Sequence, residues 1–164
     1  ADLENGYKGH KPKKFPYPIA GNCLPHIDVF LENGYTKEEI KMIEETKKIL
    51  HNSNLKITAT AVRVPVLNSH SESINVELEK PFDLKDILNL FNNTKGITLY
   101  DDISKNKYPT ALYVSGKDDV FLGRIRRDYS LDNGLNLWVV ADNIRKGAAL
   151  NAVQIAELLI GSDN

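Results

Sequence analysis

The segment from Arg63 to His70 places two side chains capable of chemistry seven residues apart, on either side of Pro65. Arg63 shares a predicted strand face with the small residues Ala59 and Ala61, an unusual setting for a guanidinium unless an anion meets it there. A guanidinium is planar and binds a carboxylate through two parallel hydrogen bonds. That carboxylate can belong to a substrate or to a structural Arg–Glu pair, and the residues alone leave both open.

His70 lies in a polar stretch, with Ser69, Ser71 and Ser73 around it, at the start of the next predicted strand. An imidazole in such a polar turn can act as a general acid or base. A surface histidine without a function has the same sequence signature, so this alternative also stays open.

Three further positions carry reactive groups whose ordinary interpretation is structural. Glu45 and Lys48 are three apart on a predicted helix, where a surface pair contributes about 0.2–0.5 kcal/mol. Cys23 is the single cysteine, and between Asn22 and Leu24 it resembles a buried small apolar group more than a nucleophile. The residues alone assign no catalytic role to these positions.

The absence of several motifs argues against other chemistries. The ten glycines form neither a GxGxxG fingerprint nor a GxxxxGKS/T phosphate loop. The sequence contains no HExxH, no CxxC and no cluster of His and Asp, so we expect no bound metal. The 21 Lys and Arg residues are spread along the chain against 22 Asp and Glu, so we expect no nucleic-acid partner.

Length and composition predict one ordinary globular domain, because 164 residues with 41% hydrophobic content can bury a core. No apolar run approaches the roughly 20 residues that span a bilayer, so we expect a soluble protein without a membrane partner. A single cysteine and the absence of a signal-peptide pattern favour the reducing cytoplasm.

The candidate residues depend on three predicted elements. Thr36 followed by Glu39 is a capping box, and the helical spacing of apolar residues after it predicts a helix over 37–51. Residues 56–66 are rich in β-branched types and predict a strand that carries Arg63. Residues 72–79 alternate between apolar and polar types, which predicts a strand with one solvated face.

The remaining pattern predicts an α+β fold with a mostly antiparallel or mixed sheet and helices packed on one face. Residues 1–17, with several lysines and prolines, predict an extended lead-in before a single domain over 18–164. The other expected elements are a helix capped by Asp83 that ends near 92–96, strands at 97–100, 111–114, 119–127 and 135–140, a tight hairpin at Asp132-Asn133-Gly134, and a final helix from near Gly147 through Leu159.

Several long stretches, in order from about residue 18 to the end, resemble the C-terminal catalytic and dimerisation domain of bacterial aspartate-semialdehyde dehydrogenases. This resemblance implies a fold like the C-terminal domain of glyceraldehyde-3-phosphate dehydrogenase. The stretches are Gly21-Asn22-Cys23-Leu24-Pro25-His26-Ile27-Asp28, Gly34-Tyr35-Thr36-Lys37-Glu38-Glu39, Glu45-Thr46-Lys47-Lys48-Ile49-Leu50, Thr60-Ala61-Val62-Arg63-Val64-Pro65-Val66, His70-Ser71-Glu72-Ser73 and Asp142-Asn143-Ile144-Arg145-Lys146-Gly147-Ala148-Ala149-Leu150-Asn151.

The resemblance also implies roles for individual residues. Arg63 would bind the substrate carboxylate, and His70 would be the active-site acid and base. Glu45 would lie in the substrate site and Lys48 near the transferred phosphate, while Asn143 would contact NADP. These roles replace the structural interpretations of the same positions.

The activity that the resemblance implies is the reversible NADPH-dependent reductive dephosphorylation of aspartyl 4-phosphate to aspartate 4-semialdehyde, in the biosynthesis of lysine, threonine and methionine. The family's nucleophilic cysteine lies in an SNPNC-type motif, and its nucleotide-binding stretch is of the GxxGxxG type; neither is present in this sequence. Cys23 is not assigned the nucleophile's role. We therefore expect a fragment that is inactive alone, binds a small substrate and phosphate, and forms a homodimer. The alternatives are N-acetyl-glutamyl-phosphate reductase and a standalone, non-catalytic dimerisation module.

Overall fold

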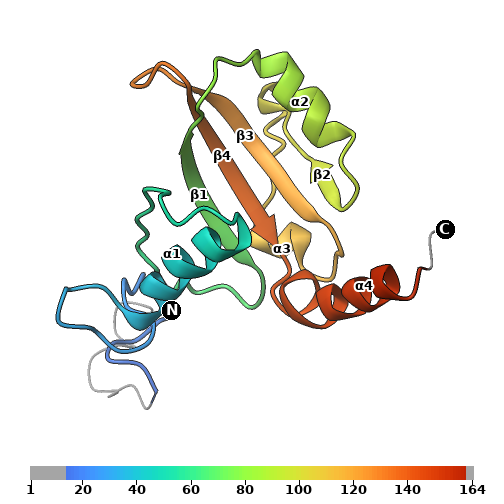
Figure 1. Ribbon diagram of the computed structural model, residues 1–164. Coiled ribbons are helices and arrows are strands. Elements are labelled where there is room, and N and C mark those ends of the chain that lie inside the picture. The colour runs from blue at the N-terminus through green and yellow to red at the C-terminus, as the bar shows by residue number, and fades with distance from the viewer. Residues whose placement is uncertain (1–13, 162–164) are drawn as a thin grey trace. The chain divides into compact units, whose positions relative to one another are not determined.

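The computed structural model describes residues 14–161 (Figure 1). The chain divides into two compact units, Ala1–Pro65 and Val66–Asn164, and each is described by itself. The predicted division into a lead-in over 1–17 and one domain over 18–164 falls partly outside the described residues and stays a prediction.

The main element of the first unit is helix α1 (Lys37–Ile49). The backbone N–H of Glu39 donates to Thr36 Oγ1 over 3.3 Å, and the N–H of Thr36 donates to Glu39 Oε2 over 2.7 Å. This is the reciprocal capping box that the sequence predicts, and it satisfies two backbone donors that the first helical turn leaves unpaired. Ile43 is buried beneath the helix. The helix predicted over 37–51 is thus confirmed, ending two residues earlier.

The strand predicted over 56–66 is wrong. Residues 56–66 are extended, but they form a single isolated bridge in which Arg63 and Leu24 exchange backbone hydrogen bonds of 2.8 and 2.9 Å. The N–H of Ala61 instead donates to Glu39 Oε1 on α1, over 2.8 Å. β-Branched residues favour an extended backbone, but a strand also needs a neighbouring backbone along several residues. Within the described part of this unit, Leu24 supplies that neighbour at one point.

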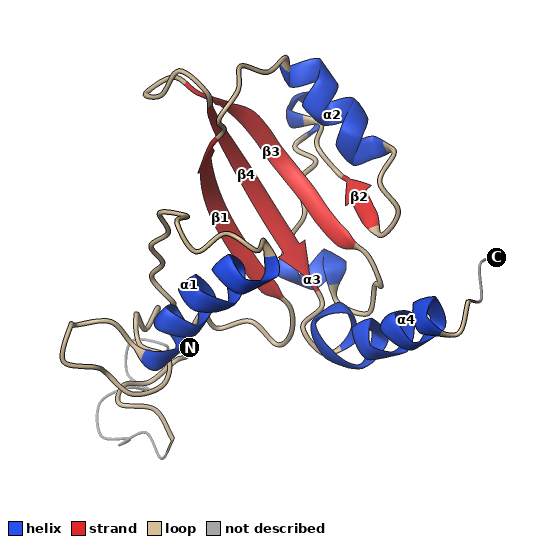
Figure 2. Cartoon of the chain, in the orientation of Figure 1, coloured by secondary structure: helices blue, strands red, loops and turns tan. Residues whose placement is uncertain are grey.

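Within the described residues, the second unit forms a four-stranded sheet in the order β1-β4-β3-β2 (Figure 2). The β1–β4 and β3–β4 pairs are antiparallel and the β2–β3 pair is parallel. This confirms the predicted α+β class with a mixed sheet. The strands are β1 (His70–Glu77), β2 (Ile97–Leu99), β3 (Val120–Asp128) and β4 (Gly134–Ala141).

Helix α2 (Leu84–Asn92) covers one face of this sheet. The side chain of Asp83 accepts the N–H of Lys85 over 2.7 Å and caps the helix as predicted. Apolar side chains of α2 pack on a buried cluster of Leu122 and Leu135 with Ile125, which forms the main core of the unit.

The predicted strand over 111–114 is also wrong, because these residues form the one-turn helix α3 (Ala111–Val114). Thr110 caps it by accepting the N–H of Tyr113. Val114 is fully buried with Phe121 and Val140, on the sheet face opposite α2. A four-residue apolar run fits either a strand or a buried helical turn, and here the cap determines the helix.

The hairpin between β3 and β4 is confirmed, but its connection is longer than a two-residue turn. Asp128 pairs with Gly134, so residues 129–133 form the loop. The Asp128 carboxylate accepts the backbone N–H and the hydroxyl of Ser130, at 2.9 and 2.7 Å. A bulge between Gly123 and Arg126 shifts the register further along the same pair.

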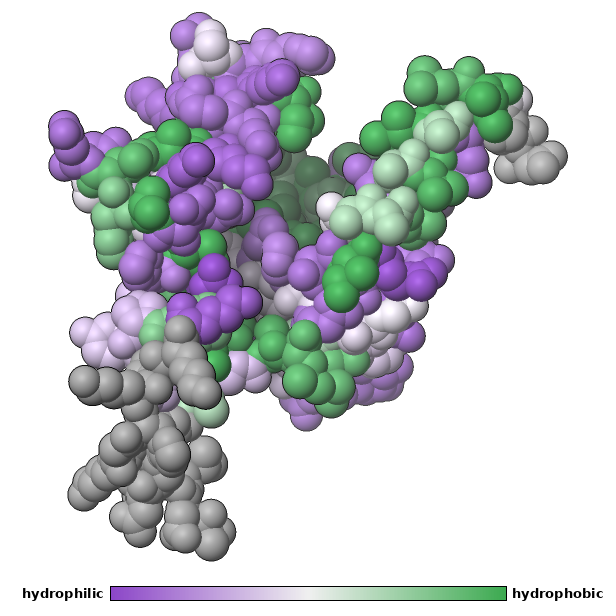
Figure 3. All heavy atoms as spheres, turned by 90° about the horizontal axis from the view of Figure 1, so that it is seen from below, coloured by the Kyte–Doolittle hydropathy of each residue, from purple (hydrophilic) through white to green (hydrophobic). Residues whose placement is uncertain are grey.

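The C-terminal helix begins with a π-helical turn η2 (Arg145–Ala149) and continues as α4 (Leu150–Leu159), which confirms the final predicted helix. A short 3₁₀ turn η1 (Ile103–Lys105) lies earlier in this unit. Several apolar side chains of the α4 segment are largely exposed, among them Leu158 at 77%, Leu159 at 82% and Ile160 at 78%. Figure 3 shows them gathered on the arm at the right of the view. Among residues 14–161, no helix is both long and apolar enough to cross a lipid bilayer.

Candidate functional site

The five predicted site residues fall into two groups. Glu45, Lys48 and Arg63 belong to the first unit, and His70 and Asn143 belong to the second. Each group is therefore described within its own unit.

Arg63 is half-buried, and its backbone is held by the bridge to Leu24. Its guanidinium lies over the ring of Phe15, 5.2 Å from the centroid. Among the described residues, no carboxylate forms an ion pair with Arg63. The structural Arg–Glu pair that the sequence left open is therefore not found in the described part of the chain, and the guanidinium donors can take an external anion.

Glu45 and Lys48 are both exposed near the end of α1, and with Ile49 and His51 they line a surface concavity of about 420 Å³. The surface pair expected between them is not among the ion pairs of the described residues. The pairs that α1 does form are Lys41–Glu38 at 3.7 Å and Lys47–Glu44 at 3.0 Å. Within residues 14–161, Lys48 thus presents an ammonium without a counter-ion, a compact charge that suits a phosphate group.

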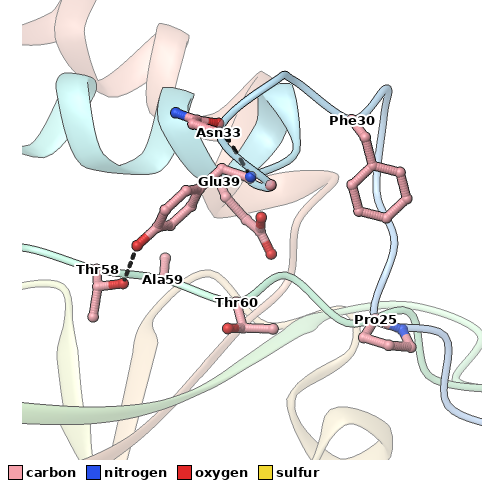
Figure 4. A pocket seen from close by; sticks show the side chains of 9 residues that line it. Pro25, Phe30, Asn33, Glu39, Thr58, Ala59 and Thr60 are labelled. Atoms are coloured by element: carbon pink, nitrogen blue, oxygen red, sulfur yellow. Dashed lines mark hydrogen bonds between the residues drawn. The ribbon is translucent and has the colours of Figure 1, made fainter.

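A second concavity of about 340 Å³ in the first unit contains none of the predicted site residues (Figure 4). Tyr35 and Thr58 share a hydroxyl hydrogen bond of 2.9 Å at its rim. The buried Glu39 reaches it, but its two oxygens already accept the N–H groups of Thr36 and Ala61. These donors lower the pKa of Glu39. We interpret this carboxylate as structural.

His70 is the first residue of β1 and pairs with Ala141 at the end of β4. Its side chain is exposed, and no hydrogen bond of the imidazole is found within the described residues. The residue before it, Ser69, has a φ of 77°, in the left-handed region that serine seldom adopts. The position of His70 is therefore set by its backbone.

Asn143 lies beside this backbone, because its Oδ1 accepts the N–H of Ser69 over 2.8 Å. The structure thus places the predicted acid/base residue and the predicted cofactor contact at neighbouring strand ends. The preceding residue, Asp142, is 1% exposed. Its pKa is lowered to about 2 because backbone N–H groups, first that of Gly116 and then that of Arg145, donate to the carboxylate. No role is predicted for Asp142 from the sequence, although it opens the stretch 142–151 that carries part of the resemblance.

Residues 2–146 match the family described as semialdehyde dehydrogenase, dimerisation domain. The chain belongs to this family.

Curated relatives of this dimerisation domain include aspartate-semialdehyde dehydrogenases. The protein of Aquifex aeolicus is 55% identical over 150 residues, which cover 92% of this chain and 44% of the relative. That of Legionella pneumophila is 54% identical over 159 residues, covering 96% of this chain and 46% of the relative. The chain therefore spans less than half the length of these relatives.

Solved structures give the same result for the dimerisation domain. The aspartate semialdehyde dehydrogenase II of Vibrio cholerae, complexed with ASA, superposes with a TM-score of 0.87 at 46% identity, covering 94% of this chain and 45% of that one. The enzyme of Candida albicans with NADP superposes with a TM-score of 0.70 at 26% identity, covering 86% of this chain and 45% of that one.

The residues present fit one contact to a nucleotide cofactor and not a whole binding site. Asn143 is half-buried, and no partner of its Nδ2 is found among the described residues, so this amide keeps a donor for a ligand oxygen. The sequence of the domain contains no glycine-rich phosphate loop. In the described part of the chain, no group of three or more His, Cys, Asp or Glu side chains could hold a metal ion.

Proposed function

We propose that this dimerisation domain supplies the substrate-binding and acid/base residues of an NADP-dependent aspartate-semialdehyde dehydrogenase. The reaction is the reversible reductive dephosphorylation of aspartyl 4-phosphate to aspartate 4-semialdehyde. The observation that carries the proposal is the identity of more than half of the aligned residues with aspartate-semialdehyde dehydrogenases along nearly the whole chain. The guanidinium of Arg63, for which the described part of the chain supplies no ion-pair partner, supports it from the structure.

The charged groups of the first unit match the charges of such a substrate. Arg63 binds its carboxylate through two parallel hydrogen bonds, for which a guanidinium is suited. Lys48 binds the phosphate as a compact point charge, and Glu45 suits the ammonium group of the same substrate. Each of these side chains lacks an ion-pair partner among the described residues, so binding breaks no such pair.

His70 moves protons at the reacting carbon. In the oxidative direction, which consumes inorganic phosphate and forms aspartyl 4-phosphate, it accepts the proton of the cysteine thiol as the thiolate attacks the aldehyde. It then assists proton transfer at the oxygen of the resulting hemithioacetal. The imidazole is exposed, and no hydrogen bond of its nitrogens is found in the described part of the chain, so they are available for proton transfer. Asn143 would contact NADP through its amide donor, and NADP, when bound, accepts or supplies the hydride.

The cysteine and the main nucleotide-binding stretch must come from elsewhere, because neither motif is present in this sequence. We therefore propose that this chain is inactive alone and completes the active site of a polypeptide of about the relatives' length. The exposed apolar side chains of α4 support this proposal, because a helix with such a surface normally packs on a partner. In the complete enzyme, α4 would cover part of the nucleotide-binding region.

The proposal also includes a homodimer, supported by the family's description as a dimerisation domain. Strand β1 lies at one edge of the sheet, and an edge strand with unpaired backbone groups favours association. Sedimentation velocity on this chain tests this part, with a dimer as the expected species. The cytoplasmic location expected from the sequence stays a prediction.

The activity is tested as phosphate-dependent NADPH formation from aspartate semialdehyde. The assay compares this chain alone with a polypeptide in which it follows the N-terminal half of the Aquifex aeolicus relative. We expect activity in the joined protein and none in the chain alone. Lys48→Ala should raise the KM for phosphate, whereas Lys47→Ala, one residue earlier on α1 and paired with Glu44, is the matched control.

Four results would contradict the proposal in different ways. Activity in this chain alone would make Cys23 the nucleophile. Equal effects of the two lysine variants would remove Lys48 from the site. A joined protein that folds and dimerises but shows no activity would favour the standalone dimerisation module, and activity on N-acetyl-glutamyl phosphate instead would favour the sister reductase.

A further inference from the structure

The carboxylate of Asp142 joins three separate segments of the second unit. Its Oδ2 accepts the side-chain amide of Asn68 at 2.8 Å and the backbone N–H of Gly116 at 2.7 Å. Its Oδ1 accepts the N–H groups of Ile144 and Arg145 at 2.8 and 3.0 Å. These contacts hold together the loop before β1, the turn after α3 and the bend after β4, which lie close together in Figure 1.

A second set of bonds extends this junction to the residue before His70. The N–H of Ser69 donates to the Oδ1 atoms of both Asn68 and Asn143, each at 2.8 Å. The Ser69 hydroxyl donates to the carbonyl of Ala111 at 3.2 Å. Ser69 is buried at 6% exposure and has a φ of 77°. A non-glycine residue keeps such a backbone only where surrounding contacts hold it there.

The strand register connects this junction to the position of His70. His70 pairs with Ala141, so Ser69 and Asp142 are the residues that flank this pair at the ends of β1 and β4. No hydrogen bond of the imidazole is found within the described residues, so its place depends on where its backbone enters the strand. The hydrogen bonds among Ser69, Asn68, Asn143 and Asp142 determine where the backbone begins this strand.

We propose that Asp142, Asn68, Asn143 and Ser69, here named the Asp142 cluster, position His70 for proton transfer. Asp142 is a positioning residue that acts through the backbone of Ser69 and does not touch the substrate. The catalytic meaning of this inference rests on the proposed function, since His70 has its role only there. A buried charge with directional donors suits the task, because moving any one segment leaves a polar group without its partner.

The hydrogen bonds of the Asp142 cluster fix the positions of both Asn143 and His70. Asn143 follows Asp142 directly in the chain and uses one oxygen to hold Ser69, which leaves its amide donor toward a ligand. A change in the cluster therefore displaces the acid/base residue together with the proposed cofactor contact. Such a loss lowers kcat more than it raises the KM for substrate, whose carboxylate binds to Arg63.

The test uses two variants and a control in the same region. Asp142→Asn replaces one acceptor oxygen with a donor that faces the donors of Asn68 and Gly116. Asn68→Ala is milder, because Asp142 keeps its backbone donors, and it serves if the first variant does not fold. The control is Asp118→Asn, which removes an exposed carboxylate paired with Arg145 but leaves the cluster bonds intact.

The first readout is NMR of this chain, with the His70 ring resonances assigned by His70→Gln. Both cluster variants should shift the Cε1–H resonance of His70, while the resonances of His26 and His51 stay in place. The second readout is the joined enzyme. There kcat should fall on the order of ten- to hundredfold, with a changed pH profile and a KM for aspartate semialdehyde within about twofold.

The outcomes separate this inference from the proposed function. Unchanged His70 resonances in both variants would overturn the positioning role, whatever the activity. Shifted resonances with unchanged kcat and pH profile in an active enzyme would overturn it as well. Shifted resonances in a joined protein without activity would support the positioning of His70 and refute the proposed function. Asp118→Asn should match the unsubstituted protein in both readouts.

Discussion

Replacing Arg63 with leucine should weaken substrate binding while leaving the free energy of unfolding nearly unchanged, because this side chain makes few contacts within the described residues. Its guanidinium has no ion-pair partner among the described residues and contacts the ring of Phe15 at 5.2 Å from the centroid. A cation–π contact at a partly exposed site contributes about 0.5–1 kcal/mol. Leucine keeps much of the apolar contact of the half-buried stem. The free energy of unfolding should therefore fall by less than about 1 kcal/mol.

The expected effect on the reaction is much larger. A bidentate guanidinium–carboxylate contact consists of two charge-assisted hydrogen bonds, each with a net contribution of about 1.5–3 kcal/mol. Losing both corresponds to at least about 3 kcal/mol, or a drop of about 100-fold or more in kcat/KM for aspartate semialdehyde. Arg63→Lys keeps the positive charge but not the planar guanidinium. Its kcat/KM should therefore lie between that of the unsubstituted enzyme and that of Arg63→Leu.

The assay pairs steady-state kinetics of the joined enzyme with urea unfolding of this chain. Arg126→Leu, which removes an exposed arginine from β3, is the control and should leave kcat/KM nearly unchanged. Loss of more than about 2 kcal/mol of unfolding free energy in Arg63→Leu would show that Arg63 has a structural partner after all. A kcat/KM within a few-fold of the unsubstituted enzyme would refute the substrate-binding role.

Three further predictions concern stability and are measured by thermal or chemical unfolding. Gly123→Ala should destabilise the second unit by about 1–3 kcal/mol, because a Cβ there would lie 2.5 Å from Pro109 Cδ; Gly147→Ala, whose nearest contact would be at 3.7 Å, should be near neutral. Thr36→Ala should remove the helix cap and about 1 kcal/mol, and Thr36→Ser should restore most of it. Asp142 has a folded-state pKa lowered from 3.8 to about 2, so its stabilising contribution is fully present above about pH 4 and is lost as the pH falls through 2. The acid-induced loss of stability, followed by circular dichroism, should therefore be shallower in Asp142→Asn, and an unchanged slope would show that this carboxyl does not titrate with folding.

Elements with a local signal were predictable from the sequence. The capping box at Thr36 and the cap at Asp83 each place a helix start where the structure has it. The alternation along 72–79 predicts β1, whose Ile74 and Val76 are half-buried between exposed neighbours. These patterns depend on residues a few positions apart, so the rest of the fold does not need to be known.

The two wrong strands show where local information ends. Residues 56–66 have strand composition, but their backbone donors go to single partners, such as Leu24 and the Glu39 side chain, that no local pattern specifies. Residues 111–114 form one helical turn because Thr110 caps them and Val114 enters a core made by distant strands. In both segments, contacts with residues distant in the sequence determined the secondary structure.

In the candidate site as well, long-range contacts decide which charged residues are structural and which are available to a ligand, and the sequence alone does not show these contacts. The buried carboxylates of Glu39 and Asp142 accept hydrogen bonds on both oxygens, and they hold the backbone around them. In contrast, Arg63 and Lys48 have no ion-pair partner among the described residues. A charged group that already accepts or donates hydrogen bonds at all its polar atoms stabilises the fold. A charged group without a counter-ion, in a concavity or on a half-buried stem, remains available to bind a ligand. The sequence could identify all four residues by type, but their division into structural and ligand-binding groups depends on long-range pairing. On this criterion Arg63 and Lys48 are the substitutions to make first, because changing either one should alter binding before it alters the fold.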